Sequence, residues 1–325
     1  MNSVSAAARR VLLGLIGRAV TGAPIEPPER GWVDAELALS GFRKTAKSLL
    51  VRRLMRRGLE AGPVTILTPA LGGLFTIATP GTDFGVGWEI LEHGTYEPHV
   101  VEFYRRTLKP GMAVLDVGAN IGFHALHAAT LVGPAGRVIA VEPDPQSAAL
   151  LRLSLSLAGG GLPVTVLEAA LSDAPGELVQ SDLGNAGNSG ARFTHKERGR
   201  LEALVHGVHP QFRTVRAVVW DDGYPDTRID FVKIDIEGFE PYALRGMERS
   251  LARYRPIVLS EFAPSNLTSI GGTEPSAYLA WFRARGYRVE LVEERTARPL
   301  AVTDEEALRS VGGGHHVDLA FVPES

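Results

Sequence analysis

The chain has 325 residues, a formal charge of −3 and no cysteine. Its length is sufficient for one large α/β domain with an extension and a substantial buried core. The lack of cysteine excludes disulfides, thiolate metal sites and a cysteine nucleophile, and the reducing cytoplasm is taken as the default location. No apolar run reaches the roughly 20 residues that span a bilayer, and no signal-peptide cleavage site is evident.

Positive charge is concentrated in residues 1–60, which contain eleven Lys and Arg against five Asp and Glu. This segment therefore carries +6 and the remainder −9. Residues 1–30 predict a short helix and a proline-containing connector. Residues 33–60 predict a basic amphipathic helix that packs on the domain or, alternatively, lies on the inner face of an anionic membrane. Nucleic-acid binding is not expected, because aromatic residues do not alternate with these charges.

Two strands of a hairpin are predicted within residues 61–80, where VTILTP and LFTIATP are separated by a glycine pair. The segment GTYE, residues 94–97, then leads into a helix that is expected to end near residue 108. Thr95 is the candidate N-cap of this helix. Pro98 falls in the first turn, where a missing N–H costs little.

The stretch AVLDVGANIGFH has the pattern of a strand, a tight turn and a helix, with Asp116 on the strand and Gly118 and Gly122 bounding the turn. Such a junction lets the backbone approach a ligand at the carboxyl end of the strand. A dinucleotide fingerprint would require glycine where this chain has Asn120 and Phe123. The turn therefore favours a nucleoside ligand without phosphates, such as S-adenosylmethionine, over a nicotinamide cofactor.

The next predicted strand, residues 138–141, leads directly into Glu142. A carboxylate at the end of an adjacent parallel strand can accept hydrogen bonds from both ribose hydroxyls of a nucleoside. Each motif alone is weak evidence for a nucleoside site, since acidic residues also lie at the ends of many strands simply because they are solvated there. The two motifs occur in this order and are separated by one helix, and together they favour nucleoside binding.

The middle of the chain continues the alternation of helices and strands. A helix is expected over residues 146–157 and a strand over residues 164–168. Residues 174–214 form a long polar insertion without obvious regular structure, which we interpret as a candidate lid or substrate-binding element. A strand over residues 214–220 is expected to return the chain to the domain.

The block DFVKIDIEGFE carries the second group of candidate site residues. Strand alternation places Lys233 and Asp235 on one face, and a lysine inside an apolar strand indicates a polar site. Glu237 and Gly238 begin a turn into a helix. The following strand ends near Glu261, so that four strand-end carboxylates are expected at one edge of the sheet. For Glu261, a role in capping or solvation is an equal alternative.

The C-terminal part predicts a helix over residues 275–286 and strands over residues 288–292 and 317–322.

The motifs DVGANIG, VEPD and DFVKIDIEGFE together resemble the FkbM-type S-adenosylmethionine-dependent methyltransferases. The resemblance extends over about residues 94–322 and includes the GTYE lead-in, the segment AALSD at residues 169–173 and an Asn-x-Gly at residues 188–190. It implies a doubly wound, mostly parallel α/β sheet of seven strands, the Rossmann-like class I methyltransferase sheet, with a reversed C-terminal hairpin. The N-terminal helices and the hairpin would be an extension of this core.

The resemblance also implies roles for individual residues. The expected ligands of S-adenosylmethionine are Tyr96, Glu97, Asp116, Gly118, Asn120, Gly122, Glu142, Ala170 and Leu171, the last two beside the adenine ring. The expected catalytic residues are Asp235, Glu237 and Lys233, with His99 as a more distant candidate. A divalent cation held by Asp235 and Glu261 is possible but not favoured, so no metal ligand is assigned.

The sequence thus predicts an O-methyltransferase that acts on a hydroxyl of a glycan, glycolipid or polyketide-like secondary metabolite. Residues 61–325 are its expected methyltransferase domain and residues 1–60 a basic extension. A non-catalytic cofactor-binding module is one alternative, and a nicotinamide-dependent oxidoreductase is another that Asn120 and Phe123 disfavour.

Overall fold

The computed structural model of the protein describes residues 63–68, 71–79, 83, 85–159, 161–182, 192–204, 211–312 and 316–324. The helices expected within residues 1–60 and the Asn-x-Gly at residues 188–190 lie outside these ranges. In the part of the chain that the structure describes, no helix is long and apolar enough to cross a membrane.

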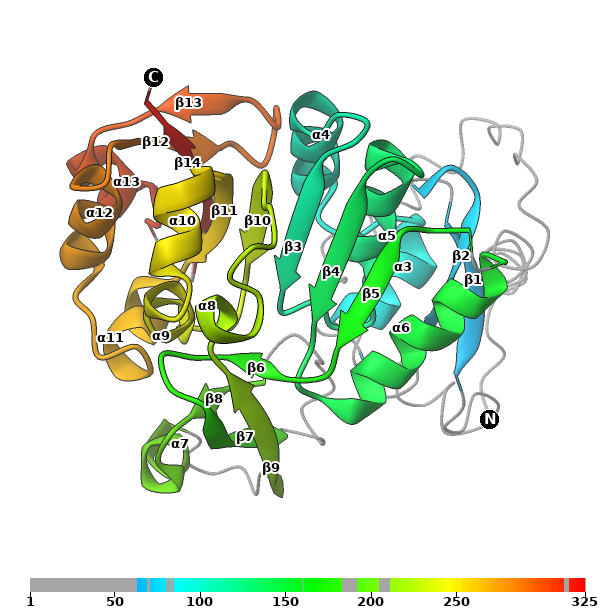
Figure 1. Ribbon diagram of the computed structural model, residues 1–325, viewed down its shortest axis with the longest axis horizontal. Coiled ribbons are helices and arrows are strands. Elements are labelled where there is room, and N and C mark those ends of the chain that lie inside the picture. The colour runs from blue at the N-terminus through cyan, green and yellow to red at the C-terminus, as the bar shows by residue number, and fades with distance from the viewer. Residues whose placement is uncertain are drawn as a thin grey trace, which may run out of the picture.

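The centre of the fold is an eight-stranded sheet made of β13 (Pro299–Ala301), β12 (Tyr287–Val292), β14 (Val317–Pro323), β11 (Ile257–Phe262), β10 (Phe231–Ile234), β3 (Ala113–Val117), β4 (Arg137–Val141) and β5 (Val164–Leu167), in that order (Figure 1). The strands from β11 to β5 are parallel, and β14 runs antiparallel between β11 and β12. This confirms the predicted doubly wound sheet with a reversed C-terminal strand. The short edge strand β13 is an eighth strand beyond the seven expected.

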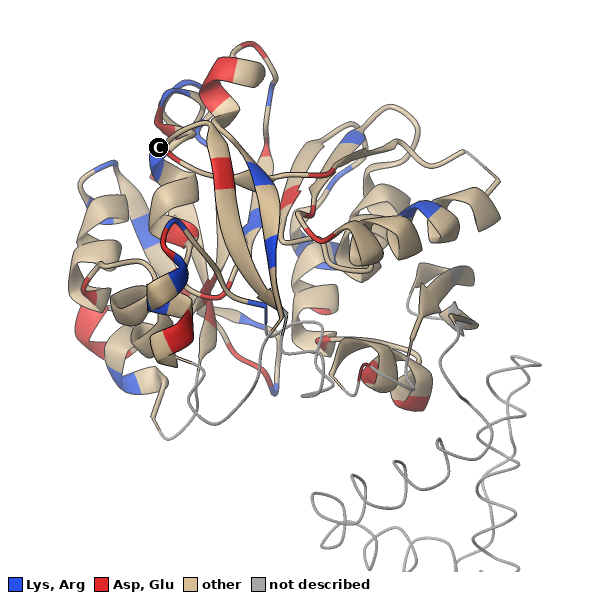
Figure 2. Cartoon of the chain, turned by 90° about the horizontal axis from the view of Figure 1, so that it is seen from below, with Lys and Arg blue, Asp and Glu red and all other residues tan. Residues whose placement is uncertain are grey.

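The strands of the sheet centre are buried on both faces. Every residue of β3 and β10 is buried, including the charged Asp116 and Lys233. Figure 2 shows that most of the described ribbon is tan, with the Lys, Arg, Asp and Glu residues as separate blue and red segments. Continuous burial is typical of parallel strands that helices cover on both sides.

Helices form the two outer layers and create a separate apolar core on each face. One core is packed by α3 (Val86–His93), α4 (Pro98–Thr107), α5 (Phe123–Val132) and α6 (Pro145–Leu157). The other core is packed by α8 (Trp220–Gly223), α9 (Glu240–Arg245), α10 (Glu248–Tyr254), α11 (Pro264–Ser269), α12 (Pro275–Arg283) and α13 (Asp304–Ser310). α5 is buried except at Thr130 and Leu131, as expected for a helix that is apolar nearly all round.

The start of α4 differs from the prediction. The helix begins at Pro98, and its N-cap position is Glu97, whose φ of 44° is left-handed and whose side chain makes no cap hydrogen bond. Thr95 is therefore not the N-cap. The left-handed turn at Glu97 ends the lead-in, and the Glu97 carboxylate pairs with His124 instead of capping the helix.

The predicted hairpin is present at the N-terminal edge of the described chain. It consists of β1 (Val64–Thr68) and β2 (Leu74–Ala78), which pair antiparallel. Ser154 of α6 accepts a hydrogen bond from the backbone N–H of Ile77 at 2.8 Å. The hairpin is thus fastened to α6.

The insertion at residues 174–214 contains regular structure that the sequence analysis did not predict. A second sheet, which we call the insertion sheet, has the order β6 (Ala170–Leu171), β9 (Gln211–Val218), β7 (Gly176–Asp182) and β8 (Thr194–His195), with α7 (Arg198–Leu204) beside it (Figure 1). The return strand β9 starts three residues earlier than expected, because its pairing with β7 extends to Gln211. It ends at Val218, and Trp220 already belongs to α8.

Candidate functional site

The turn after β3 brings the backbone closer to its neighbours than a side chain would allow. Gly118 and Gly122 have φ values of 86° and 90°, and Asn120 between them is also left-handed at 49°. A Cβ at Gly118 would lie 2.0 Å from the carbonyl oxygen of Asp235, and one at Gly122 would lie 2.1 Å from Leu151 Cδ1. Both the conformation and the close approach therefore require glycine at the two ends of this turn.

Glu142 follows β4 and ties the end of that strand to the glycine turn. Its Oε2 accepts a hydrogen bond from the Asn120 backbone N–H at 2.8 Å, and its Oε1 accepts one from the Asp144 backbone N–H at 2.7 Å. Burial raises the pKa of Glu142 to about 7, although these two hydrogen bonds oppose the shift. The carboxyl group thus holds the turn in place.

Asp116 is a buried carboxyl group without a hydrogen-bond partner. Its side chain is 1% exposed, and neither carboxylate oxygen finds a partner among the described residues. Burial raises its pKa, while the nearby Lys233 and His124 act in the opposite direction. Because leaving a buried polar group unpaired costs about 1–3 kcal/mol, this carboxyl group is suited to a ligand that donates hydrogen bonds to it.

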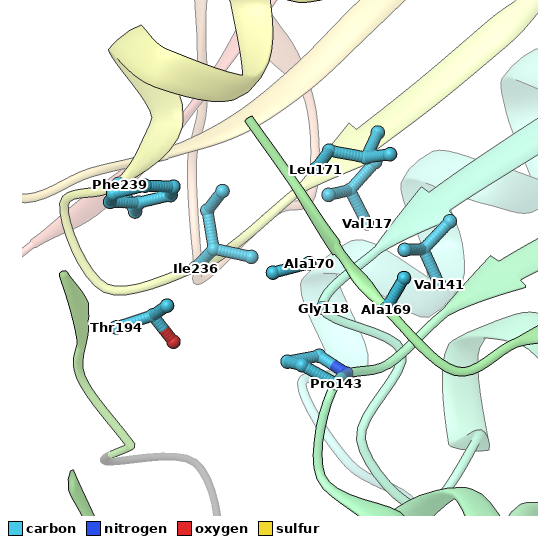
Figure 3. Close-up of a pocket in the computed structure, with 10 residues that line it drawn as sticks. All are labelled: Val117, Gly118, Val141, Pro143, Ala169, Ala170, Leu171, Thr194, Ile236 and Phe239. Carbon is cyan, nitrogen blue, oxygen red and sulfur yellow. The ribbon is translucent and has the colours of Figure 1, made fainter. Parts of the chain in front are cut away.

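Two pockets open at the carboxyl ends of the central strands and share Gly118. The apolar pocket is lined by Val117, Gly118, Val141, Pro143, Ala169, Ala170, Leu171, Thr194, Ile236 and Phe239 (Figure 3). The polar pocket is lined by Val86, Tyr96, Asp116, Gly118, Ala119, Asn120, Ile121, Phe123, His124, Lys233 and Asp235.

Most of the residues predicted from the sequence gather at these two pockets. Those that line a pocket are Tyr96, Asp116, Gly118, Asn120, Ala170, Leu171, Lys233 and Asp235. Those that line neither pocket are Glu97, Gly122, Glu142 and Glu237. The pocket residues that the sequence analysis did not assign include Phe123, His124, Thr194, Ile236 and Phe239. Ile236 lies within the KIDIEG block and Phe239 follows it directly, and this position in the sequence was the available signal for them.

Lys233 and Asp235 form the polar pair that strand alternation predicted. The distance from Lys233 Nζ to Asp235 Oδ2 is 2.7 Å, and the side chains are 4% and 27% exposed. Burial alone would lower the pKa of Lys233, but the charges of Asp235 and Asp116 outweigh it and raise that pKa well above its ordinary value. The lysine is therefore a permanent buried cation, and its more exposed partner carboxylate borders the polar pocket.

Two more carboxyl groups lie near Asp235. Glu237 has a left-handed φ of 56° and accepts a hydrogen bond from Asn266 Nδ2 at 3.0 Å. Burial, followed by the charge of Asp235, raises the pKa of Glu237 to about 8 and that of Glu261 well above its ordinary value. Across the described ranges no group of three or more His, Cys, Asp and Glu residues is arranged to hold a metal ion.

The lead-in before α4 forms another wall of the polar pocket. Glu97 Oε2 lies 2.8 Å from His124 Nε2, and the two groups form an ion pair when the histidine is protonated. Burial opposes ionisation of Glu97, but the hydrogen bond and charge of His124 lower its pKa to about 2. The Tyr96 ring packs against the rings of Phe123 and His124 at centroid distances of 6.1 and 5.7 Å.

Residues 116–289, more than half of the chain, match the family model described as the methyltransferase FkbM domain. Methyltransferase sdnD of Sordaria araneosa is 26% identical over 176 residues, which are 47% of this chain and 68% of that protein. The AMB antimetabolite synthetase AmbE of Pseudomonas aeruginosa is 28% identical over 272 residues, 73% of this chain.

The chain spans only 12% of the length of AmbE and 43% of that of the ribosomal RNA large subunit methyltransferase E of Sorangium cellulosum, to which it is 36% identical over 93 residues. Among solved structures, methyltransferase FkbM from Methylobacillus flagellatus is 14% identical with a TM-score of 0.40. That match covers 77% of this chain and 64% of the other.

Proposed function

Because this chain belongs to the FkbM methyltransferase family, we propose that it transfers a methyl group from S-adenosylmethionine to a hydroxyl of a glycan, glycolipid or polyketide-like secondary metabolite. The observation that carries the proposal is the unpaired Asp116 carboxyl group between the glycine turn and the buried Lys233. A glycine turn alone occurs in many nucleotide sites. A buried carboxyl group without a partner beside that turn indicates a ligand with hydrogen-bond donors.

The residues present fit S-adenosylmethionine. Ala170 and Leu171 would pack on its adenine ring in the apolar pocket, and Asp116 would receive the ammonium group of its methionine part in the polar pocket. Glu142 would reach the ribose between them through the remaining lone pairs of its carboxylate. When bound, the cofactor supplies an electrophilic methyl group on a sulfonium.

The residues on the acceptor side would position the hydroxyl and take up its proton. A proton acceptor must lie within reach of the acceptor hydroxyl, and Asp235 borders the polar pocket with its Oδ2 2.7 Å from Lys233 Nζ. Glu237 is a poorer base at neutral pH, because its pKa of about 8 leaves it mostly protonated. We assign the proton-accepting role to Asp235 and a hydrogen-bonding role to Glu237.

The name of one relative supports the secondary-metabolite branch of this proposal, because AmbE is an antimetabolite synthetase. We further propose that residues 61–325 are the methyltransferase domain and that residues 1–60 are an extension outside the site. Peripheral membrane contact through residues 33–60 is an alternative role for that extension.

Two measurements test the proposed function. Isothermal titration with S-adenosylmethionine and with NAD should give binding of the former only, and binding of NAD alone would replace the proposal by an oxidoreductase. Incubation with cell extracts and radiolabelled methyl donor should label a small molecule or glycan. Donor binding without any labelled product in extracts of the native organism would instead favour a non-catalytic cofactor-binding module.

A further inference from the structure

Among the described residues that line the apolar pocket, Thr194 has the one polar side chain. It belongs to β8 of the insertion sheet and is 6% exposed. In Figure 3 its side chain lies across the pocket from Val141 and Ala169. No hydrogen bond of its hydroxyl is found within the described part of the chain. A hydroxyl group facing an otherwise apolar cavity is available to a ligand.

The insertion sheet holds Thr194 in a fixed relation to the turn after β4. Arg192, two residues earlier, places Nη1 3.2 Å from Asp144 Oδ2 and 2.7 Å from Ser147 Oγ. Arg213 of β9 pairs with the other oxygen of Asp144, which is completely buried. Buried, charge-assisted contacts of this kind are strong and directional. The sheet that carries Thr194 is therefore anchored beside Glu142 rather than free to swing as a lid.

The lining of the apolar pocket suits a heterocycle with a polar edge. Aliphatic side chains and the Phe239 ring offer apolar surface to its faces. A threonine hydroxyl can accept a hydrogen bond from an amino group on the edge of the ring. We propose that Thr194 accepts a hydrogen bond from the exocyclic amino group of adenine and so selects the base of the cofactor.

This inference rests on the proposed function, since it assumes that S-adenosylmethionine binds with its adenine in the apolar pocket. It also changes the role expected for the insertion. Residues 174–214 were interpreted as a lid or acceptor element, whereas Thr194 and Arg192 make the insertion sheet a wall of the cofactor site.

The test measures the affinity of the full-length protein for S-adenosylhomocysteine by isothermal titration. Thr194→Val removes the hydroxyl at nearly constant volume and should weaken binding about three- to tenfold, the usual effect of losing one neutral hydrogen bond. Thr194→Ser keeps the hydroxyl and should stay within about twofold of the wild type. Thr214→Val is the matched control, because Thr214 is exposed on β9 of the same sheet.

A second ligand separates recognition of the amino group from a structural role of Thr194. An analogue of S-adenosylhomocysteine with hydrogen in place of the 6-amino group should bind wild type and Thr194→Val equally. Thr194→Val that binds S-adenosylhomocysteine like the wild type would overturn the inference, as would an equal loss for both ligands. If wild type and Thr214→Val bind neither ligand, the proposed function itself is wrong.

Discussion

The apolar and polar pockets share Gly118 but differ in the residues that line them and in the sheets that supply those residues. The apolar pocket has one hydroxyl among nine apolar or glycine residues, and two separate sheets contribute to it. The polar pocket contains Asp116, Lys233, Asp235 and His124, and all its residues come from the central sheet and its adjoining helices and loops. Shape and contact area therefore dominate binding in the first, and charge dominates in the second.

This difference separates two kinds of effect. Losing a single contact in the apolar pocket removes a small part of a large contact area and should change affinity modestly. The buried Lys233 interacts with the charges of Asp235, Asp116 and Glu97. A substitution that removes one of these charges therefore also removes an interaction that stabilises the buried lysine. We therefore expect the largest effects on turnover there.

The largest effect is expected for Asp235→Asn. The change keeps the shape of the side chain and removes the proposed proton acceptor, so turnover should fall by about 10²–10⁴-fold while donor affinity changes little. Single-turnover methyl transfer at saturating donor is the measurement. Asp226→Asn is the control, since that side chain is 82% exposed. Near-normal turnover of Asp235→Asn would assign the proton to Glu237 or leave catalysis to positioning alone.

Glu142→Ala should weaken binding of S-adenosylmethionine by about tenfold or more, since a hydrogen bond to a charged group contributes roughly 1.5–3 kcal/mol. The substitution also removes the hydrogen bond that the Asn120 backbone N–H donates to the Glu142 carboxylate, so the glycine turn after β3 should become less rigid. Titration calorimetry compares this variant with Glu168→Ala, whose side chain is exposed just after β5. Unchanged affinity in a folded Glu142→Ala protein would remove the ribose assignment.

The pKa of Glu237 predicts a pH-dependent stability. Because burial raises it from its ordinary value of 4.5 to about 8, the folded protein binds this proton more tightly than the unfolded chain does. The stabilising contribution is complete below about pH 4.5 and is lost as the pH rises through about 8. Thermal unfolding between pH 7 and pH 9 should therefore show falling stability.

Glu237→Gln should reduce this slope without abolishing it, because Glu142 and Glu240 also have pKa values raised to about 7. The glutamine oxygen can still accept the hydrogen bond from Asn266. Glu168→Gln, on the surface, should leave the slope unchanged. An identical slope for wild type and Glu237→Gln would show that Glu237 ionises normally in the folded protein.

The smallest effect is expected for the N-terminal segment. Deletion of residues 1–30 should leave donor affinity within about twofold of the full chain, because every predicted cofactor ligand follows them. A folded truncated protein that no longer binds the donor would contradict the proposed division of the chain at residue 60.

Local patterns were enough to predict the parts of the site that lie within one strand and its following turn. The apolar run into Asp116 and the pair Gly118 and Gly122 specify β3 and its turn, because backbone conformation there depends on neighbouring residues. The Lys233 and Asp235 pair follows from strand alternation for the same reason. The reversed C-terminal strand followed from the family resemblance.

Tertiary structure alone decided which distant residues meet. β7 was missed because polar Gln180 and Ser181 are buried in it, which hides the alternation of apolar and polar residues. Glu97 and His124 are 27 residues apart, and the Glu97 carboxylate contacts His124 rather than capping α4. Thr194 lines the apolar pocket from the insertion sheet, beside which Arg192 and Arg213 converge on the buried Asp144. Such contacts depend on how separate elements pack, so the sequence pattern within one element does not predict them.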